Sequence, residues 1–183
     1  YQVPTNTPGL LANLTLLNVT PTAIYLDQAN AVVSNCVFRD TTCGGIAVGA
    51  SLQNDSRLTA LDCAFRNLTG KGAVGIEWNT VANNNNTFVA TNCTFQNNYS
   101  SYGTVYSGAS VVGRFQFTQC LFSNNSVPNT GVQDSFASTG VYVWWASGSG
   151  FLQIDRCQFI DNTIPEIMTG QRIFFAGISN AND

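Results

Sequence analysis

The chain has 183 residues, the size of one domain, and 44% of them are hydrophobic, which is enough to build a core. Charged residues make up only 9%, far below the roughly 25% usual for soluble domains. The net charge of −3 and the lack of a basic stripe argue against a nucleic-acid partner. No apolar run approaches the roughly 20 residues of a membrane-spanning helix, so we expect no membrane span in this chain.

In chain order, residues 1–12 contain two prolines and no amphipathic pattern, which indicates an extended N-terminal arm. A degenerate repeat follows, in which Leu14-Thr-Leu16 precedes Asn18. From there a Cys-x-Phe motif recurs five times, at intervals of 27 to 37 residues. An internal repeat at such a period is typical of a solenoid, so we expect residues 13–183 to form one repeat domain. The core ladder of this motif consists of Cys36, Phe38, Cys63, Phe65, Cys93, Phe95, Cys120, Phe122, Cys157 and Phe159.

Each copy of the repeat predicts three short strands. Apolar residues stand five and three positions before each Cys, as Phe88 and Ala90 do before Cys93, and this alternation is typical of a half-buried strand. A mostly polar pair before the Cys predicts a corner, after which Cys and Phe return to the inner face. A third apolar run follows at residues 45–48, 73–76, 103–106, 140–143 and 172–175, and residues 83–86 and 127–139 are predicted to be loops.

An Asp or Asn stands two residues after every Phe of the motif. These side chains tolerate the left-handed backbone conformation, so the pattern predicts a second turn in each copy. This turn ladder consists of Asp40, Asn67, Asn97, Asn124 and Asp161.

Three strands per copy with corners between them predict an all-β fold, a parallel β-helix of about six coils stacked roughly 4.8 Å apart. The Phe side chains would then form an inner stack and the Cys side chains a row of thiols. The alternative is an antiparallel sandwich, which also has short strands at regular spacing but gives no reason for one motif to recur in register.

Six cysteines raise the question of disulfides and metals. Five share one inward repeat position, where a free Cys behaves as a small hydrophobic residue. Cys43 lies off that row, and a Cys36–Cys43 disulfide is a candidate. There is no His and no Cys-x-x-Cys, so zinc is not expected, and no cofactor is expected either.

Eight Asn-x-Ser/Thr sequons are candidate N-glycosylation sites, and several fall at the predicted turns, where a glycan would point into solvent. They are Asn13, Asn18, Asn54, Asn67, Asn85, Asn92, Asn98 and Asn124. A composition rich in Asn, Ser and Thr also creates sequons by chance, and Asn92 is doubtful because it sits at a corner between core residues. With so few charges on the surface, the sequons favour a secreted, N-glycosylated protein.

Catalytic residues are hard to find. A glycosidase needs two facing carboxylates about 5–10 Å apart, whereas the ten carboxylates of this chain are scattered over turns, corners and different coils. His, the commonest acid–base group, is absent. We therefore expect no enzyme. Four aromatic residues are candidates for an exposed binding face, with the alternative that the register is off by one and they belong to the core. They are Trp78, Tyr106, Trp144 and Phe174.

The repeat resembles the right-handed parallel β-helix repeats of large surface proteins, in particular the polymorphic outer-membrane protein family. That family has Phe-x-x-Asn motifs, which Phe95-Gln-Asn-Asn98, Phe122-Ser-Asn-Asn125 and Phe159-Ile-Asp-Asn162 match, and Gly-Gly-Ala motifs, which Gly44-Gly45-Ile46-Ala47 only approximates. The resemblance covers roughly residues 12–178. It implies a right-handed β-helix and a role as an adhesin or surface scaffold.

These observations favour a non-enzymatic, extracellular structural glycoprotein. The ends of the repeat lack a recognisable cap, and uncovered solenoid ends pair with other chains, so we expect head-to-tail self-association into a fibre or scaffold. An adhesin or carbohydrate-binding surface module is the alternative, and a pectate-lyase-like enzyme is the third interpretation.

Overall fold

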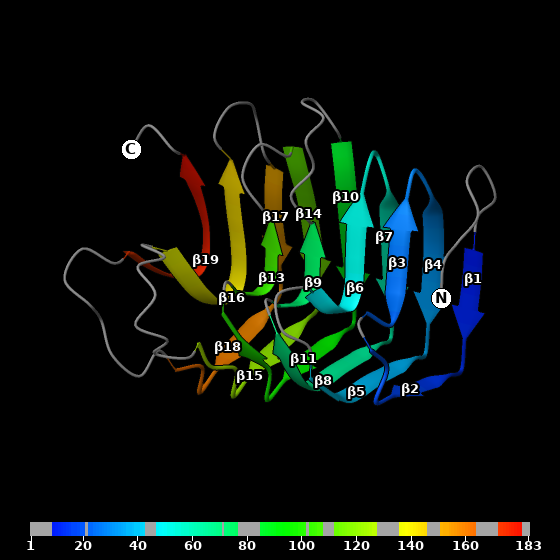
Figure 1. Ribbon diagram of the computed structural model, residues 1–183. Coiled ribbons are helices and arrows are strands. Elements are labelled where there is room, and N and C mark those ends of the chain that lie inside the picture. Colours follow the sequence, from blue (N-terminus) through cyan, green and yellow to red (C-terminus); the bar gives the residue numbers. More distant parts are fainter. Residues whose placement is uncertain are drawn as a thin grey trace.

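The computed structural model describes residues 9–20, 22–42, 47–70, 72–76, 85–101, 103–107, 112–127, 136–145, 151–163 and 172–180. Within these ranges every regular element is a strand, and each strand pairs in parallel with its neighbours. The strands form three sheets that wrap around one interior (Figure 1). The antiparallel sandwich is therefore excluded.

Each sheet takes one strand from each turn of the chain. Sheet 1 contains β1 (Gly9–Ala12), β4 (Asn30–Ser34), β7 (Arg57–Leu61), β10 (Asn85–Thr91), β14 (Val112–Thr118) and β17 (Phe151–Asp155). Sheet 2 contains β2 (Thr15–Leu17), β5 (Val37–Thr42), β8 (Ala64–Gly70), β11 (Thr94–Gln96), β15 (Leu121–Ser123) and β18 (Gln158–Ile160), with β12 (Tyr99–Ser100) beside β8. Sheet 3 contains β3 (Ile24–Asp27), β6 (Ala47–Gln53), β9 (Gly72–Ile76), β13 (Gly103–Ser107), β16 (Phe136–Trp145) and β19 (Arg172–Asn180).

One strand from each sheet makes a coil, and the described strands make six coils. Coil 1 runs from β1 to β3, coil 2 from β4 to β6, coil 3 from β7 to β9, coil 4 from β10 to β13, coil 5 from β14 to β16 and coil 6 from β17 to β19. Six coils, each with a strand in all three sheets, confirm the predicted parallel β-helix.

Two rows of left-handed residues bend the chain, the first between sheets 1 and 2 and the second along sheet 2. The corner row lies directly before the Cys position, with φ between 51° and 57°, and consists of Asn13, Asn35, Asp62, Asn92, Gln119 and Arg156. The turn row lies two residues after the Phe position, with φ between 51° and 55°, and consists of Asn18, Asp40, Asn67, Asn97, Asn124 and Asp161. This conformation costs most L-residues about 1–2 kcal/mol and Asn or Asp less, which explains the residue types. The predicted turn ladder is confirmed and extends to Asn18.

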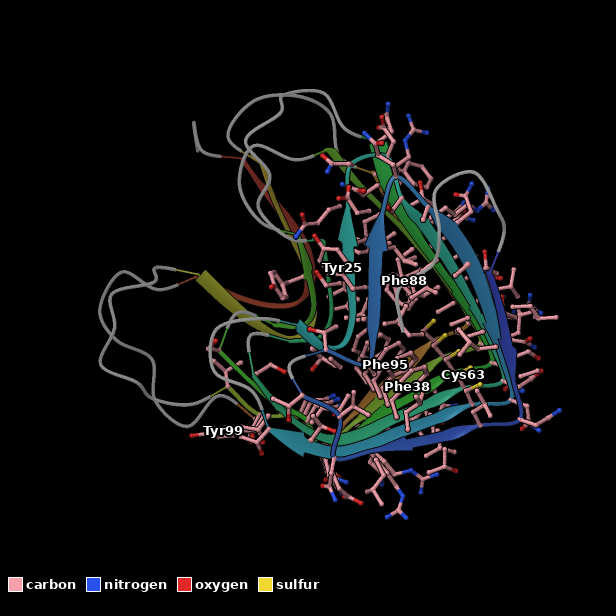
Figure 2. The ribbon with its side chains drawn as sticks, turned by 45° about the vertical axis from the view of Figure 1, so that its right-hand side comes forward. Tyr25, Phe38, Cys63, Phe88, Phe95 and Tyr99 are labelled. Carbon is pink, nitrogen blue, oxygen red and sulfur yellow. The ribbon has the colours of Figure 1, made fainter. Side chains whose placement is uncertain are left out.

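The predicted Phe stack forms the centre of the core. Phe38, Phe65, Phe95, Phe122 and Phe159 lie in register on sheet 2. Successive rings are parallel to within 8°, with centroids 4.6 to 5.0 Å apart. Figure 2 shows Phe38 and Phe95 together inside the coils. Such stacked pairs each contribute about 0.5–1.5 kcal/mol beyond the burial of their area. The ladder therefore stabilises the stacking of coils 2 to 6 on one another.

Aromatic residues of sheet 1 close the core from a second side. Phe88 meets Phe95 edge to face, with a ring angle of 88°, and Phe117 meets Phe122 at 72°. These rings point inward because the strands alternate as predicted, and Phe88, Phe115 and Phe117 are fully buried.

Three predicted boundaries differ from the structure. Residues 9–12, which we expected in an extended arm, form β1 and pair with β4, while residues 1–8 lie outside the described residues. β10 begins at Asn85, inside the predicted loop 83–86, and β16 begins at Phe136, inside the predicted loop 127–139. In each case pairing with a neighbouring coil extends a strand into a segment whose composition is typical of a loop.

Candidate functional site

The five thiols of the core ladder form one row inside the corner, and all five are free. In Figure 2 their sulfur atoms gather around the labelled Cys63. Each thiol lies within reach of the carbonyl two residues before it, and in coils 2 to 5 also of a carbonyl in the preceding coil. Cys63 Sγ, for example, is 3.2 Å from Leu61 O and 3.6 Å from Val33 O.

The thiols influence one another's protonation. Hydrogen bonds with Cys120 and Cys63 raise the pKa of Cys93 above that of an ordinary thiol. The same contacts lower the pKa values of Cys63 and Cys120 to about 7, while burial raises the pKa of Cys157. Cys63 and Cys120 are each only 2% exposed, so these thiols are closed to solvent-borne reagents and ions.

The structure gives no support to a disulfide or a metal at this row. Cys36 is a free, buried thiol, so the Cys36–Cys43 bridge is not formed here, and Cys43 lies outside the described residues. Within the described ranges, no group of three or more His, Cys, Asp or Glu side chains is arranged to hold a metal ion.

The turn row carries side-chain hydrogen bonds between coils. Asn67 Nδ2 donates to Asp40 Oδ1 across 2.7 Å, and Arg39 forms an ion pair with Asp40 at 2.6 Å. The hydrogen bond from Asn67, followed by the contact with Arg39, lowers the pKa of the Asp40 carboxyl. Both effects favour the charged carboxylate.

A second row of amides lies one residue beyond the turn row and points inward. Asn98 and Asn125 are fully buried, and Asn162 is partly buried. Asn98 Nδ2 donates to Phe65 O and to Asn125 Oδ1, each at 3.0 Å, and Asn98 Oδ1 accepts from Leu68 N at 3.1 Å. Asn125 repeats the pattern with Phe95 O and Asn162 Oδ1, and Asn162 Nδ2 reaches Phe122 O at 2.8 Å. We call Asn98, Asn125 and Asn162 the inner amide row.

Sequence reasoning missed the role of this inner amide row. Its signal was the last residue of the Phe-x-x-Asn motif, which we used only for the family resemblance. A shorter chain of hydrogen bonds lies at the corner between sheet 3 and the next strand of sheet 1. There Ser56 N donates to Asn86 Oδ1, and Ala29 N donates to Ser56 Oγ. These buried polar side chains thus form hydrogen-bond chains that run along the axis.

The sequons fall into three environments. Six of the acceptor amides are exposed, namely Asn13, Asn18, Asn67, Asn85, Asn92 and Asn124. Asn54 is partly buried. Asn98 is fully buried and uses both of its N–H groups inside the fold, which corrects our expectation that it could carry a glycan.

The expected aromatic face is not found as one stacked surface. Tyr106 is only 4% exposed, which corrects the prediction that it points into solvent. The backbone register places Tyr106 beside Tyr142, Trp144 beside Ser179 and Phe174 beside Ser138, so the predicted residues do not lie in one row. Trp78 lies outside the described residues, as do the side-chain placements of Trp144 and Phe174.

Three parallel sheets, inward Phe stacking and left-handed corners define a β-helix, the class of protein to which this architecture corresponds. A family model described as right handed beta helix region matches residues 5–164. The chain belongs to this right-handed β-helix family, which confirms the fold predicted from the repeat. The match does not extend to the finer resemblance to polymorphic outer-membrane proteins. Neither the curated proteins nor the solved structures yielded a match.

Membrane insertion by a helix has no support in the described ranges, since they contain no helix with the length and apolar character to cross a bilayer.

Proposed function

We propose that this domain is a non-enzymatic, extracellular structural glycoprotein, a β-solenoid subunit that stacks with other copies into a surface fibre or scaffold. The observation that carries the proposal is the use of polar side chains to join adjacent coils. Asp27 accepts from Asn54, Asp40 from Asn67 and Asp62 from Asn92, so an aspartate of one coil pairs with an asparagine of the next at each of the three corners. Side chains that form such contacts stabilise the stacking of adjacent coils and are not available to bind a ligand.

Two further carboxylates also form contacts within the fold. Asp55 accepts a hydrogen bond from Asn85 N at 2.6 Å, and Asp155 is paired with Arg156 at 3.0 Å. An acid–base pair for glycoside cleavage must instead face its substrate and be free to exchange protons. Asp134, Glu77 and Glu166 lie outside the described residues, so an activity assay has to include the whole chain.

Self-association through coil 6 would bury an inward side chain of its first strand. Ile154 is aligned with the fully buried Phe117 yet is 37% exposed. Coil 1 of a second copy would cover this side chain in the way that coil 6 covers Phe117. In the turn row, Asp161 of coil 6 and Asn18 of coil 1 are also the residue types that pair in Asp40 and Asn67.

Association can be tested by light scattering and electron microscopy of the full chain over a range of concentrations. We expect particles that lengthen with concentration, and Ile154→Lys should prevent this growth because it places a charge on the stacking face. Gln153→Lys is the matched control, since Gln153 is exposed and points outward on the same strand. A strictly monomeric wild-type chain would contradict the fibre.

The non-enzymatic role needs a separate test. The chain is incubated with pectin-like polymers, with and without calcium, and new chain ends are measured. We expect no turnover in either condition, and turnover would assign an enzyme. Binding to a glycan array that is lost in Trp144→Ala would instead assign a sugar-binding module.

A further inference from the structure

The turn row has a regular chemical pattern along the axis. On coils 1, 3 and 5 the turn residue begins a sequon: Asn18-Val-Thr20, Asn67-Leu-Thr69 and Asn124-Asn-Ser126. On coils 2, 4 and 6 the same turn is kept without a sequon. Asp40 and Asp161 replace the acceptor in two of these coils, and Tyr99 replaces the hydroxyl residue after Asn97 in the third. Alternate coils therefore lack a sequon for two different reasons: the acceptor Asn is replaced in coils 2 and 6, and the hydroxyl residue is replaced in coil 4.

The hydroxyl residues of these sequons also form an outward row. Thr69 is paired with Thr42 and Tyr99, Tyr99 with Ser126, and Ser126 with Thr163. The hydroxyl residues of coils 3 and 5 thus occupy equivalent places, and Thr20 has the same sequence offset from its acceptor in coil 1. Asn18, Asn67 and Asn124 are all exposed.

Spacing gives the alternation a physical meaning. Adjacent strands are about 4.8 Å apart, so acceptors on alternate coils are separated by roughly 10 Å. A pyranose ring with an N-acetyl group is wider than one coil. Glycans on every coil would therefore overlap at their first sugar, whereas glycans on alternate coils have room.

The number of free N–H groups decides which amides can be modified. A glycosylated Asn keeps one N–H, because the sugar replaces only the other hydrogen. Asn67 Nδ2 donates a hydrogen bond to Asp40 and can keep it after modification. Asn98 Nδ2 donates to two acceptors and would lose one of them inside the core.

We propose that Asn18, Asn67 and Asn124 carry a single row of N-glycans on alternate coils, which covers the bend along sheet 2. At each site the amide nitrogen attacks C1 of the sugar in a lipid-pyrophosphate-linked oligosaccharide. The C1–N bond forms, the pyrophosphate departs with its lipid, and the amide loses one proton. This row rests on the extracellular location in the proposed function and specifies which surface of the scaffold is shielded.

Site occupancy is measured on the full chain secreted from a eukaryotic host, by mass spectrometry of peptides whose glycans are released in heavy-oxygen water. We expect Asn18, Asn67 and Asn124 to be occupied and Asn98 to be empty in folded, secreted material. An occupied Asn98, or an empty site in the row, would overturn the proposal. Occupancy of Asn13 and Asn92 with an empty row would reject the row and leave the glycoprotein intact, whereas polymer cleavage would reject the structural role alone.

A second experiment tests the spacing. Asp40→Asn creates a sequon on coil 2, because Thr42 already follows two residues later. We expect no secreted molecule to carry glycans at positions 18, 40 and 67 together, and we expect a several-fold lower yield if position 40 is modified. The control Asp40→Asn with Thr42→Ala keeps the new amide without the sequon and should be secreted at the wild-type level. Secreted molecules with all three glycans would show that spacing is irrelevant.

Discussion

Asn97 and Asn98 are consecutive residues of coil 4 in opposite environments. Asn97 is exposed, with φ of 54°, and belongs to the turn row. Asn98 is fully buried, and its side chain takes part in three hydrogen bonds of the inner amide row. The outer position therefore needs a residue that tolerates the left-handed conformation, and the inner position needs an amide that both donates and accepts. This difference explains why Asp and Asn interchange in the turn row, whereas coils 4 to 6 all have Asn in the inner row.

The largest effect is expected for Asn98→Ala. The substitution leaves Leu68 N and Phe65 O without their side-chain partner in a buried region, and Asn125 Oδ1 loses one of its donors. Because each orphaned group costs about 1–3 kcal/mol, we expect the free energy of unfolding to fall by roughly 4 kcal/mol. Urea unfolding of chain produced in bacteria, which leaves the sequons unmodified, measures this loss.

Asn98→Asp provides the matched control for that experiment. It keeps the acceptor for Leu68 N, but it replaces the two N–H donors with a buried carboxylate oxygen that faces Phe65 O and Asn125 Oδ1, so at neutral pH its stability should be no higher than that of Asn98→Ala. A loss of less than about 1 kcal/mol in Asn98→Ala would show that the inner amide row contributes little beyond one ordinary hydrogen bond.

A smaller effect is expected at the neighbouring outer position. Asn97→Ala keeps the exposed backbone in the left-handed region, which should cost about 1 kcal/mol. Asn97→Gly should be close to neutral, because Gly adopts positive φ readily. The pair is compared by the same urea experiment, and an equal loss in Ala and Gly variants would contradict a purely conformational role for this position.

The sequence allowed much of this architecture to be predicted, because equivalent positions of successive coils have the same inward or outward orientation and similar residue types. Inward Phe95 and left-handed Asn97 follow from alternation and residue type alone, and each recurs in five copies. The inner role of Asn98 was not predicted, because an Asn next to a turn cannot be distinguished by residue type from an Asn within the turn. Its burial depends on where the chain points after the turn, which is set by the neighbouring coils.

The candidate binding face shows a second limit of pattern analysis. The predicted binding face required Tyr106 to point outward, and its alternative placed Tyr106 in the core. Val105 and Tyr106 are both buried, and β13 and β16 shift register between Gly103 and Val105. Gly72 shows how closely the chain approaches here, since a Cβ at that position would lie 2.6 Å from Tyr106 Cδ1. When both faces of a strand are buried, apolar and polar residues need not alternate along it, so the sequence pattern does not indicate which side chains face solvent.

The smallest effect concerns Asp40 of the turn row and its dependence on pH. The hydrogen bond from Asn67 and the contact with Arg39 lower the pKa of Asp40 in the folded state, relative to an unfolded value of about 4. The unfolded chain then binds a proton more readily, so Asp40 adds stability above that value and loses it as the pH falls through the folded pKa. In bacterially produced chain, Asp40→Asn should therefore be less stable than the wild type at neutral pH and should approach it in acid. Asn67→Gly, which keeps the turn and removes the amide donor, should weaken this pH dependence, and an equal gap between wild type and Asp40→Asn at both pH values would contradict the role of the charge.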